Sequence, residues 1–139
     1  MKYFTLITAL LLSLSANAEI TIKCGPMVGK HFMNNEWSDD KIERDTLFVV
    51  GENRYADILN DEAYSYKRDG FEVTVLSIPT GVVFLAIYSN PTDFLMDVYS
   101  INSETQVLTL TRKKSVSVNG NSMEWSSVYT GRCDFSSNK

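Results

Sequence analysis

The sequence is poor in the residues that metal sites and most catalytic sites need. It has one histidine, His31, and two cysteines, Cys24 and Cys133, among 139 residues. A zinc site takes four ligands, often from closely spaced cysteines, and a catalytic triad needs a histidine beside its nucleophile. No Cys-x-x-Cys spacing, phosphate loop or dinucleotide-binding glycine motif is present either. We therefore expect no metal, no cofactor and no enzymatic activity.

Positive charge is also scarce. The chain has 13 Lys and Arg residues against 17 Asp and Glu residues, which gives a formal net charge of −4. Proteins that bind nucleic acid usually carry a basic surface that neutralises phosphates, and an anionic membrane repels an acidic protein. We therefore expect no nucleic-acid partner.

The longest apolar run of the chain lies at its beginning. Residues 3–14 carry no charge and lead to Ala-Asn-Ala at 16–18, a small-x-small pattern that signal peptidase recognises. Spanning a bilayer takes about 20 apolar residues, more than this run provides. We expect residues 1–18 to be a signal peptide, with an uncleaved anchor as the alternative. Residues 19–139 are then a single secreted domain, periplasmic or extracellular, without a membrane span.

The two cysteines lie near the two ends of the expected mature chain. In an oxidising compartment such a pair normally forms a disulfide, and Cys24–Cys133 is the only pairing possible within one chain. The bond requires Cα atoms within about 7 Å of each other. We therefore expect the first and last strands to be neighbours.

Turn residues recur along the chain at short intervals, and β-branched and aromatic residues fill the runs between them. Asp69-Gly70 and Asn119-Gly120 are the strongest hairpin signals, because a type I′ turn needs positive φ at both central residues. We expect an all-β domain of about eight to ten strands. It is either an antiparallel β-barrel (lipocalin-like or calycin-like) or a two-sheet sandwich. The expected strands are 19–24, 46–50, 54–59, 63–68, 71–78, 82–89, 94–101, 106–112, 115–118 and 123–131.

Two segments depart from the alternating pattern. Residues 82–89 are apolar on both strand faces, which indicates cover on both sides or contact with a ligand or partner on one. Residues 25–45 are polar, and we expect one short helix at 38–44, capped by Ser38.

A hydrolase hypothesis depends on that helix. Asp39 and Glu43 would share one helix face, and Asp40 lies beside them in the sequence. Paired carboxylates can perform acid–base chemistry across a cleft. A solvated helix start is the favoured interpretation of the same residues.

Two groups of residues are candidate interfaces. Tyr64 and Tyr66 share a strand face, and tyrosine is enriched in binding hot spots, although a place in the core is the alternative. Arg112, Lys113 and Lys114 form the only basic run. Such a run can protect a sheet edge from aggregation or dock an acidic partner.

The expected architecture is similar to that of the small periplasmic lysozyme inhibitors, which are disulfide-bearing β-barrels. The chain lacks the Ser-Gly-x-x-Tyr segment of that group and the Gly-x-Trp start of lipocalins, since Glu36 precedes Trp37. We assign no family. We expect a binding module, either a protein inhibitor or a carrier of a small apolar ligand. The alternative is a structural component of an envelope or virion assembly, and a carboxylate-based hydrolase is the least favoured.

Overall fold

The protein is nearly all β structure. The computed structural model describes residues 20–60 and 64–137, with side chains up to Phe135, so the expected signal peptide lies outside the described residues. Within these residues, no helix is long and apolar enough to cross a membrane. The strands are β1 (Ile20–Cys24), β2 (Met27–Met33), β3 (Glu36–Ile42), β4 (Thr46–Val50), β5 (Ala56–Asn60), β6 (Tyr64–Ser65), β7 (Glu72–Ile78), β8 (Gly81–Ser89), β9 (Asp93–Asn102), β10 (Val107–Val118) and β11 (Asn121–Ser137). A 3-10 turn, η2 (Glu52–Arg54), lies between β4 and β5.

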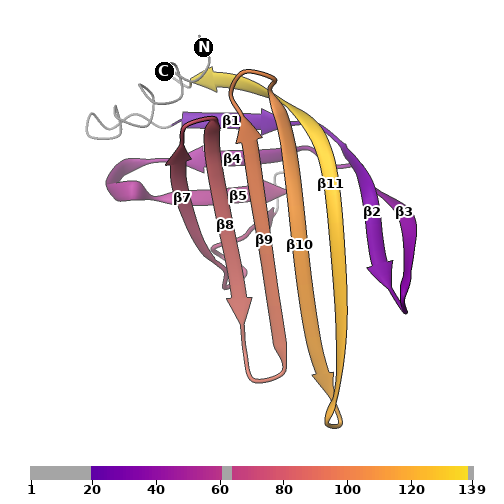
Figure 1. The fold of residues 1–139 in the computed structure, drawn as a ribbon. Coiled ribbons are helices and arrows are strands. Elements are labelled where there is room, and N and C mark those ends of the chain that lie inside the picture. Colours follow the sequence, from indigo (N-terminus) through magenta and orange to yellow (C-terminus); the bar gives the residue numbers. More distant parts are fainter. Residues whose placement is uncertain (1–19, 61–63, 138–139) are drawn as a thin grey trace.

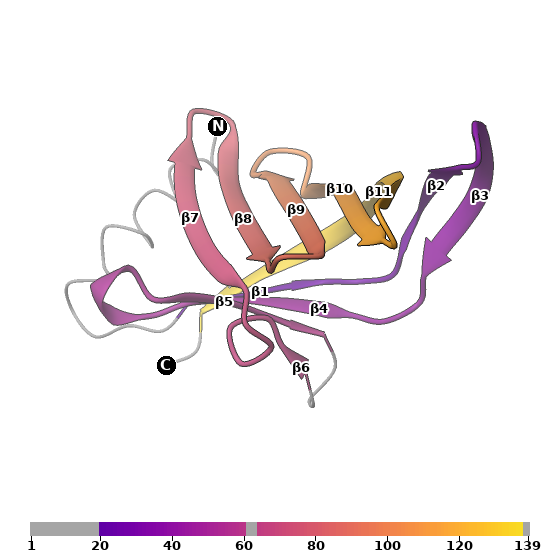
Figure 2. The ribbon, with the colours of Figure 1, turned by 90° about the horizontal axis from the view of Figure 1, so that it is seen from below.

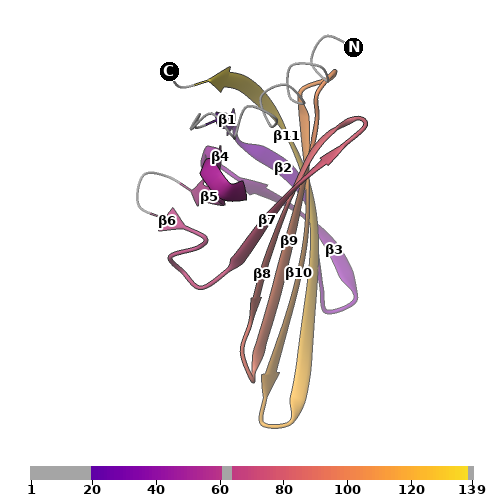
Figure 3. The same ribbon diagram turned by 90° about the vertical axis from the view of Figure 1, so that its left-hand side faces the viewer.

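The strands form one antiparallel sheet that curls into a half-barrel. Its order is β6-β5-β4-β1-β11-β10-β9-β8-β7, and β2 pairs with both β11 and β3. β11 links two layers, because its last residues pair with β1 while its earlier residues pair with β10 and β2. Figure 1 shows β1, β4 and β5 crossing one end of β7–β10, and Figure 3 shows the same layers from the side. The all-β prediction is confirmed, and the sheet is a half-barrel.

A bulge between β1 and β2 directs the chain from one layer into the other. Cys24 lies opposite Cys133, and Val28 lies opposite Thr130. Residues 25–27 therefore face only residues 131 and 132, which leaves one extra residue on the bulged side. This segment contains Pro26, which has no N–H for a ladder bond, and the Gly25 amide donates to the Arg132 carbonyl at 2.9 Å.

The hydrophobic core fills the concave face of the half-barrel where the two layers cross. Phe48 of β4 packs against Phe84 of β8 and Tyr99 of β9, with ring centroids 4.8 and 5.0 Å apart. All three are buried. Figure 2 shows this arrangement from below, with β7–β10 arching over β1 and β4. The buried apolar residues form one cluster, so the interior at this end is filled by side chains.

The predicted Cys24–Cys133 disulfide is present. The two residues are directly opposite in the β1–β11 ladder, with Cα atoms 3.9 Å apart. The first and last strands are therefore neighbours, as the pairing required.

The predicted helix at 38–44 is wrong. These residues belong mainly to β3, which pairs with β2 in a hairpin closed by Asn34 and Asn35. Both asparagines have positive φ, 55° and 64°, which a two-residue hairpin turn requires and asparagine tolerates. This hairpin lies where we expected irregular chain, and it is one reason the described strands number eleven instead of eight to ten.

The two strongest turn signals have different outcomes. Asn119 and Gly120, with φ of 51° and 79°, close the β10–β11 hairpin as predicted. Asp69-Gly70 forms a turn but no hairpin, because β6 pairs with β5 and β7 pairs with β8. The separate strands expected at 106–112 and 115–118 are one strand, β10.

Candidate functional site

A polar pocket opens where the concave face extends beyond the crossing strands. Along this face of β10, Leu108 and Leu110 are buried, Arg112 is partly exposed and Lys114 is exposed. Figure 1 shows the ends of β8–β11 continuing past β5. The pocket has a volume of about 370 Å³ and is lined by His31, Asp40, Leu95, Arg112, Lys114, Trp125, Ser127 and Tyr129.

Sheet register brings four of the polar residues into one row. Asp97 of β9 lies opposite Arg112 of β10, and Arg112 lies opposite Ser127 of β11. Ser127 in turn lies opposite His31 of β2. Directly opposed residues of an antiparallel pair point to the same face, so this row crosses the concave face of four strands.

Asp97 and Arg112 form a partly buried ion pair at the inner end of the pocket. The Asp97 side chain is fully buried, and Arg112 donates to it through Nε at 2.7 Å and Nη2 at 2.9 Å. Burial alone would lower the pKa of Arg112, but the hydrogen bonds and charge of Asp97 raise it above its ordinary value. Arg112 therefore stays charged, and its bidentate geometry holds the guanidinium in one orientation.

Tyr66 connects this ion pair to the segment between β6 and β7. Its hydroxyl donates to Asp97 at 2.8 Å and shares a hydrogen bond with the Tyr99 hydroxyl at 2.7 Å. Burial, with the nearby Asp97 charge, raises the pKa of Tyr66 to about 12. The phenol is therefore neutral near pH 7 and donates a hydrogen bond to the carboxylate.

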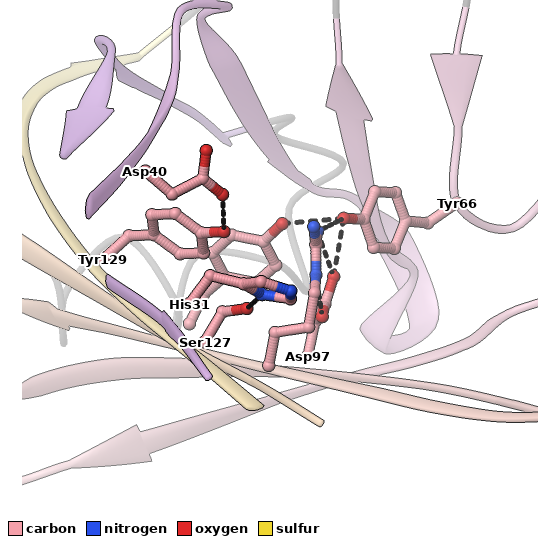
Figure 4. A network of polar contacts seen from close by, with 8 residues as sticks. His31, Asp40, Tyr66, Asp97, Ser127 and Tyr129 are labelled. Carbon is pink, nitrogen blue, oxygen red and sulfur yellow. Dashed lines mark hydrogen bonds and ion pairs between the residues drawn. The ribbon is translucent and has the colours of Figure 1, made fainter. Parts of the chain in front are cut away.

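Two further hydrogen bonds connect β11 to β2 and β3, as Figure 4 shows. The Tyr129 hydroxyl donates to Asp40 at 2.7 Å, and Nδ1 of His31 lies 2.7 Å from the Ser127 hydroxyl. The hydrogen bond from Tyr129 is the main reason that the pKa of Asp40 lies below its usual value. Burial, together with Asp40, raises the pKa of Tyr129. Asp40 is therefore ionised and oriented, while Tyr129 remains protonated.

The outer wall of the pocket is aromatic and apolar. Lys114 lies opposite Leu95 on one side and Trp125 on the other. Its ammonium is 5.5 Å from the centre of the Trp125 ring, within the range of a cation–π contact. One wall therefore offers an aromatic surface and the other offers hydrogen-bonding groups.

The structure divides the predicted basic run between two faces. Arg112 and Lys114 point into the pocket, whereas Lys113 lies on the opposite, convex face of the sheet. The predicted tyrosine pair is divided too, because Tyr64 is 55% exposed while Tyr66 is buried. The two tyrosines do not form a common surface.

The carboxylates of the hydrolase hypothesis are also separated. On a strand, successive side chains alternate, so Asp39 and Asp40 face opposite sides of the sheet. Asp39 is exposed beside Lys30 with 3.7 Å between Nζ and Oδ1, and Glu43 pairs with Lys41 beyond the end of β3. Of the three, Asp40 alone lines this pocket.

The centre of the site was not predicted from the sequence. Asp97, Trp125, Ser127 and Tyr129 were not among the candidate residues. The usable signal is a polar residue at a core position of an alternating strand. Asp97 interrupts the apolar strand 94–101 in this way, and Arg112 follows Leu108 and Leu110 on the same face.

Residues 82–89 are apolar on both sides of their strand, and one of these sides belongs to the convex face of the sheet. Val82, Phe84 and Ala86 are buried in the core, whereas the alternate residues point to the convex side and are partly exposed. They continue into a patch on β7–β9 formed by Leu76, Val83, Leu85, Ile87, Met96 and Val98. Further along this face, Trp37 is 51% exposed and lines a separate pocket of about 460 Å³ with Val28 and Val128.

No protein-family model matches the sequence, and a search of curated proteins finds no significant match. The pocket is therefore the feature from which a function is inferred. Its groups are fixed by mutual hydrogen bonds, and they offer an aromatic ring, a carboxylate and cationic donors within one cavity. Such a set can orient a ligand, because a few fixed polar groups beside an apolar wall give specificity.

Proposed function

We propose that the protein is an exported binding module that recognises its partner at the pocket between β2, β3 and β9–β11. The observation that carries the proposal is the rigid set of polar groups around the pocket. Asp40 is held by Tyr129 and Arg112 is held by Asp97, at distances of 2.7–2.9 Å. Groups fixed before binding lose little side-chain freedom when a partner arrives, which favours recognition.

Export is supported by two features of the chain. The first 18 residues have the order of a secretory signal peptide, and Cys24 is bonded to Cys133. Disulfides persist mainly in oxidising compartments such as the periplasm and the extracellular space.

Recognition at a surface pocket is favoured over transport of a small apolar ligand. A carrier encloses its ligand in an unfilled apolar interior, whereas Phe48, Phe84 and Tyr99 pack ring against ring at the centre of this core. Native mass spectrometry of the exported protein checks this point. We expect the mass of a disulfide-bonded chain beginning near Glu19, and a retained apolar ligand would instead favour the carrier.

The proposal is tested by photo-crosslinking at two adjacent positions. Lys113 and Lys114 lie on opposite faces of β10, so a photoreactive lysine analogue at each position probes one face. The full chain carrying either analogue is irradiated in the cells that produce it. We expect an adduct from position 114 that disappears in the Trp125→Ala background, and none from position 113. Adducts from position 113 alone, or from neither position, would overturn the proposal.

A structural component of an assembly remains the second candidate, and the apolar patch on the convex face favours it. Leu76 is 50% exposed there, and Leu85 and Val98 lie opposite each other in the β8–β9 ladder. Contiguous exposed apolar surface commonly marks an interaction site. Light scattering after size exclusion tests this candidate. A stable oligomer that dissociates on Leu85→Lys would support it, and a monomer at all concentrations would exclude self-assembly through this face.

A further inference from the structure

We propose that the ligand of the pocket is a saccharide, with one sugar ring stacked on Trp125 and its hydroxyls bonded to Asp40 and Arg112. This inference rests on the proposed function and names the chemistry that the pocket recognises. A sugar ring has an apolar face of C–H groups and an edge of hydroxyls, so it requires an aromatic surface beside groups that donate and accept hydrogen bonds.

The apolar requirement is met by the outer wall. Trp125 is partly exposed and lines the pocket together with Leu95. The two residues lie on β11 and β9, on either side of Lys114 of β10. An indole ring provides a large, rigid contact surface and loses little conformational entropy when a ligand covers it. Lys114 lies between these two residues, and its ammonium is positioned to bond a hydroxyl at the pocket rim.

The polar requirement is met by groups that keep bonding capacity after their internal contacts. In the described residues, the hydrogen bonds of Arg112 use Nε and Nη2, and the bond of His31 uses Nδ1. Nη1 of Arg112 and Nε2 of His31 are therefore available to a ligand. Asp40 is exposed and accepts one bond at each carboxylate oxygen, from Tyr129 and from the Lys41 amide. An ionised carboxylate has about four acceptor sites, so it can accept further hydroxyl donors.

The balance of charge favours an uncharged polyol over a simple anion. The charge of Arg112 is already neutralised by Asp97, and the negative Asp40 offsets the positive Lys114. An anion would meet little net attraction in this cavity. An apolar ligand would bury Asp40 and Arg112 without replacing their bonds to water, which costs free energy for each group. A neutral molecule with many hydroxyls avoids both penalties.

The size of the cavity agrees with this ligand class. A volume of about 370 Å³ lies at the lower end of the range for small-molecule sites, about 300–1,000 Å³. The pocket therefore accommodates a short part of a chain, and the rest of an oligosaccharide extends past the rim at Lys114.

The two tryptophans make the test specific, because they lie on opposite faces of the sheet. Trp125 lines this pocket, whereas Trp37 lines the pocket on the convex face. The full mature chain, labelled with 15N, is titrated with soluble oligosaccharides of glucose, galactose, mannose and N-acetylhexosamines. We expect at least one of them to shift the indole N–H signal of Trp125 and leave that of Trp37 unchanged.

Variants then separate the role of the ring from that of the fold. Trp125→Ala should weaken the binding of the responding saccharide at least about tenfold, or 1.4 kcal/mol, while the matched Trp37→Ala should bind as wild type. Asp40→Asn, which keeps the size of the side chain, should also weaken binding. Shifts confined to Trp37, or equal binding by the Trp125→Ala variant, would overturn the inference.

Failure of the saccharide inference can be told apart from failure of the binding function. If no oligosaccharide binds but crosslinking at position 114 yields a protein adduct, the saccharide inference is wrong and the pocket is a protein-recognition site. If neither experiment detects a partner at this pocket, both proposals fail.

Discussion

At the scale of single residues, the pocket is organised by tyrosine hydroxyls that donate hydrogen bonds to carboxylates. Tyr129 donates to Asp40 and Tyr66 donates to Asp97, at 2.7 and 2.8 Å. Burial, together with the nearby carboxylate, raises the pKa of each tyrosine, and the hydrogen bond from Tyr129 lowers the pKa of Asp40. Two acceptors are thereby held in fixed positions, one at the mouth of the pocket and one buried beneath it.

Tyr129→Phe tests the pair at the mouth. Without the donor, the pKa of Asp40 should rise towards its usual 3.8. A lowered carboxylate pKa stabilises the folded state above the unfolded pKa, and this contribution is lost as the pH falls through the folded pKa. We therefore expect the variant to be less stable by about 1 kcal/mol at pH 7, with a smaller difference below about pH 4.

Two measurements check this prediction. The titration of the Asp40 carboxyl carbon is followed by NMR, and the free energy of unfolding is measured by urea at several pH values. Tyr64→Phe is the matched control, since Tyr64 is exposed and outside the pocket, and it should change neither quantity. An unchanged pKa of Asp40 in Tyr129→Phe would contradict the prediction.

Arg112→Met tests the buried ion pair. The variant leaves the fully buried Asp97 carboxylate without its cation, and breaking such a pair costs about 3–5 kcal/mol. Replacing both partners, in Asp97→Leu/Arg112→Met, should recover much of this loss because no buried charge remains. Lys113→Met, on the opposite face, should change stability by less than about 0.5 kcal/mol. Urea unfolding at pH 7 measures all three, and a double variant less stable than Arg112→Met would contradict this account.

At the scale of elements, the β2–β3 hairpin completes the pocket by supplying His31 and Asp40. It continues the large layer beyond β11, and Figure 1 shows it at the edge of the sheet, next to β11. β3 is exposed along most of its length and carries Asp39, Asp40 and Lys41. Charged side chains on an edge strand discourage pairing with other chains, so β3 both protects the edge and contributes to the site.

This hairpin is also where sequence reasoning failed, and the reason is physical. Ser38, Asp39 and Asp40 are typical of a helix start, and local propensity alone favours that interpretation. Pairing with β11 overrides the propensity, because residues 28–32 of β2 form a ladder with β11 and the Asn34–Asn35 turn folds β3 back onto β2. Because of this error the pocket was not predicted, since His31 and Asp40 contact Ser127 and Tyr129 of β11 only when both lie on strands.

Gly29→Ala tests how the hairpin docks onto β11. A Cβ at Gly29 would lie 1.9 Å from the carbonyl oxygen of Val128, so the two backbones would have to separate. We expect a loss of about 1–3 kcal/mol and faster amide hydrogen exchange along β2 and β3. Gly25→Ala is the matched control, because its Cβ would meet other atoms only at 4.0 Å. Equal exchange rates in the two variants would contradict the close approach.

At the scale of the whole molecule, the sequence predicted the strand-rich fold and its covalent closure but not the curvature. Periodic turns, alternating strands and two cysteines near the chain ends were sufficient for an antiparallel fold with adjacent terminal strands. The half-barrel depends on the bulge at residues 25–27 and on the pairing of β11 with strands of both layers. Gly25-Pro26 marks an interruption of the strand without giving its direction, and the double pairing of β11 leaves no local pattern in the sequence. The site could not be predicted from local patterns either, because the register between distant strands decides which of its residues lie side by side.

Removing the disulfide tests what joins the ends of this molecule. Cys24 and Cys133 are 109 residues apart, and in the chain-entropy model closing a loop of this length contributes about 4–5 kcal/mol, an upper figure. Cys24→Ala/Cys133→Ala should therefore lose about 3–4 kcal/mol in urea unfolding. Reduced wild-type protein is the matched control and should show a similar loss. Because β1 pairs with β11 along its whole length, this ladder alone can hold the ends together, so the variant should keep the native indole N–H shift of Trp125 under folding conditions. A native-like unfolding midpoint would contradict the entropic account, and a lost Trp125 signal would mean that the disulfide also shapes the pocket.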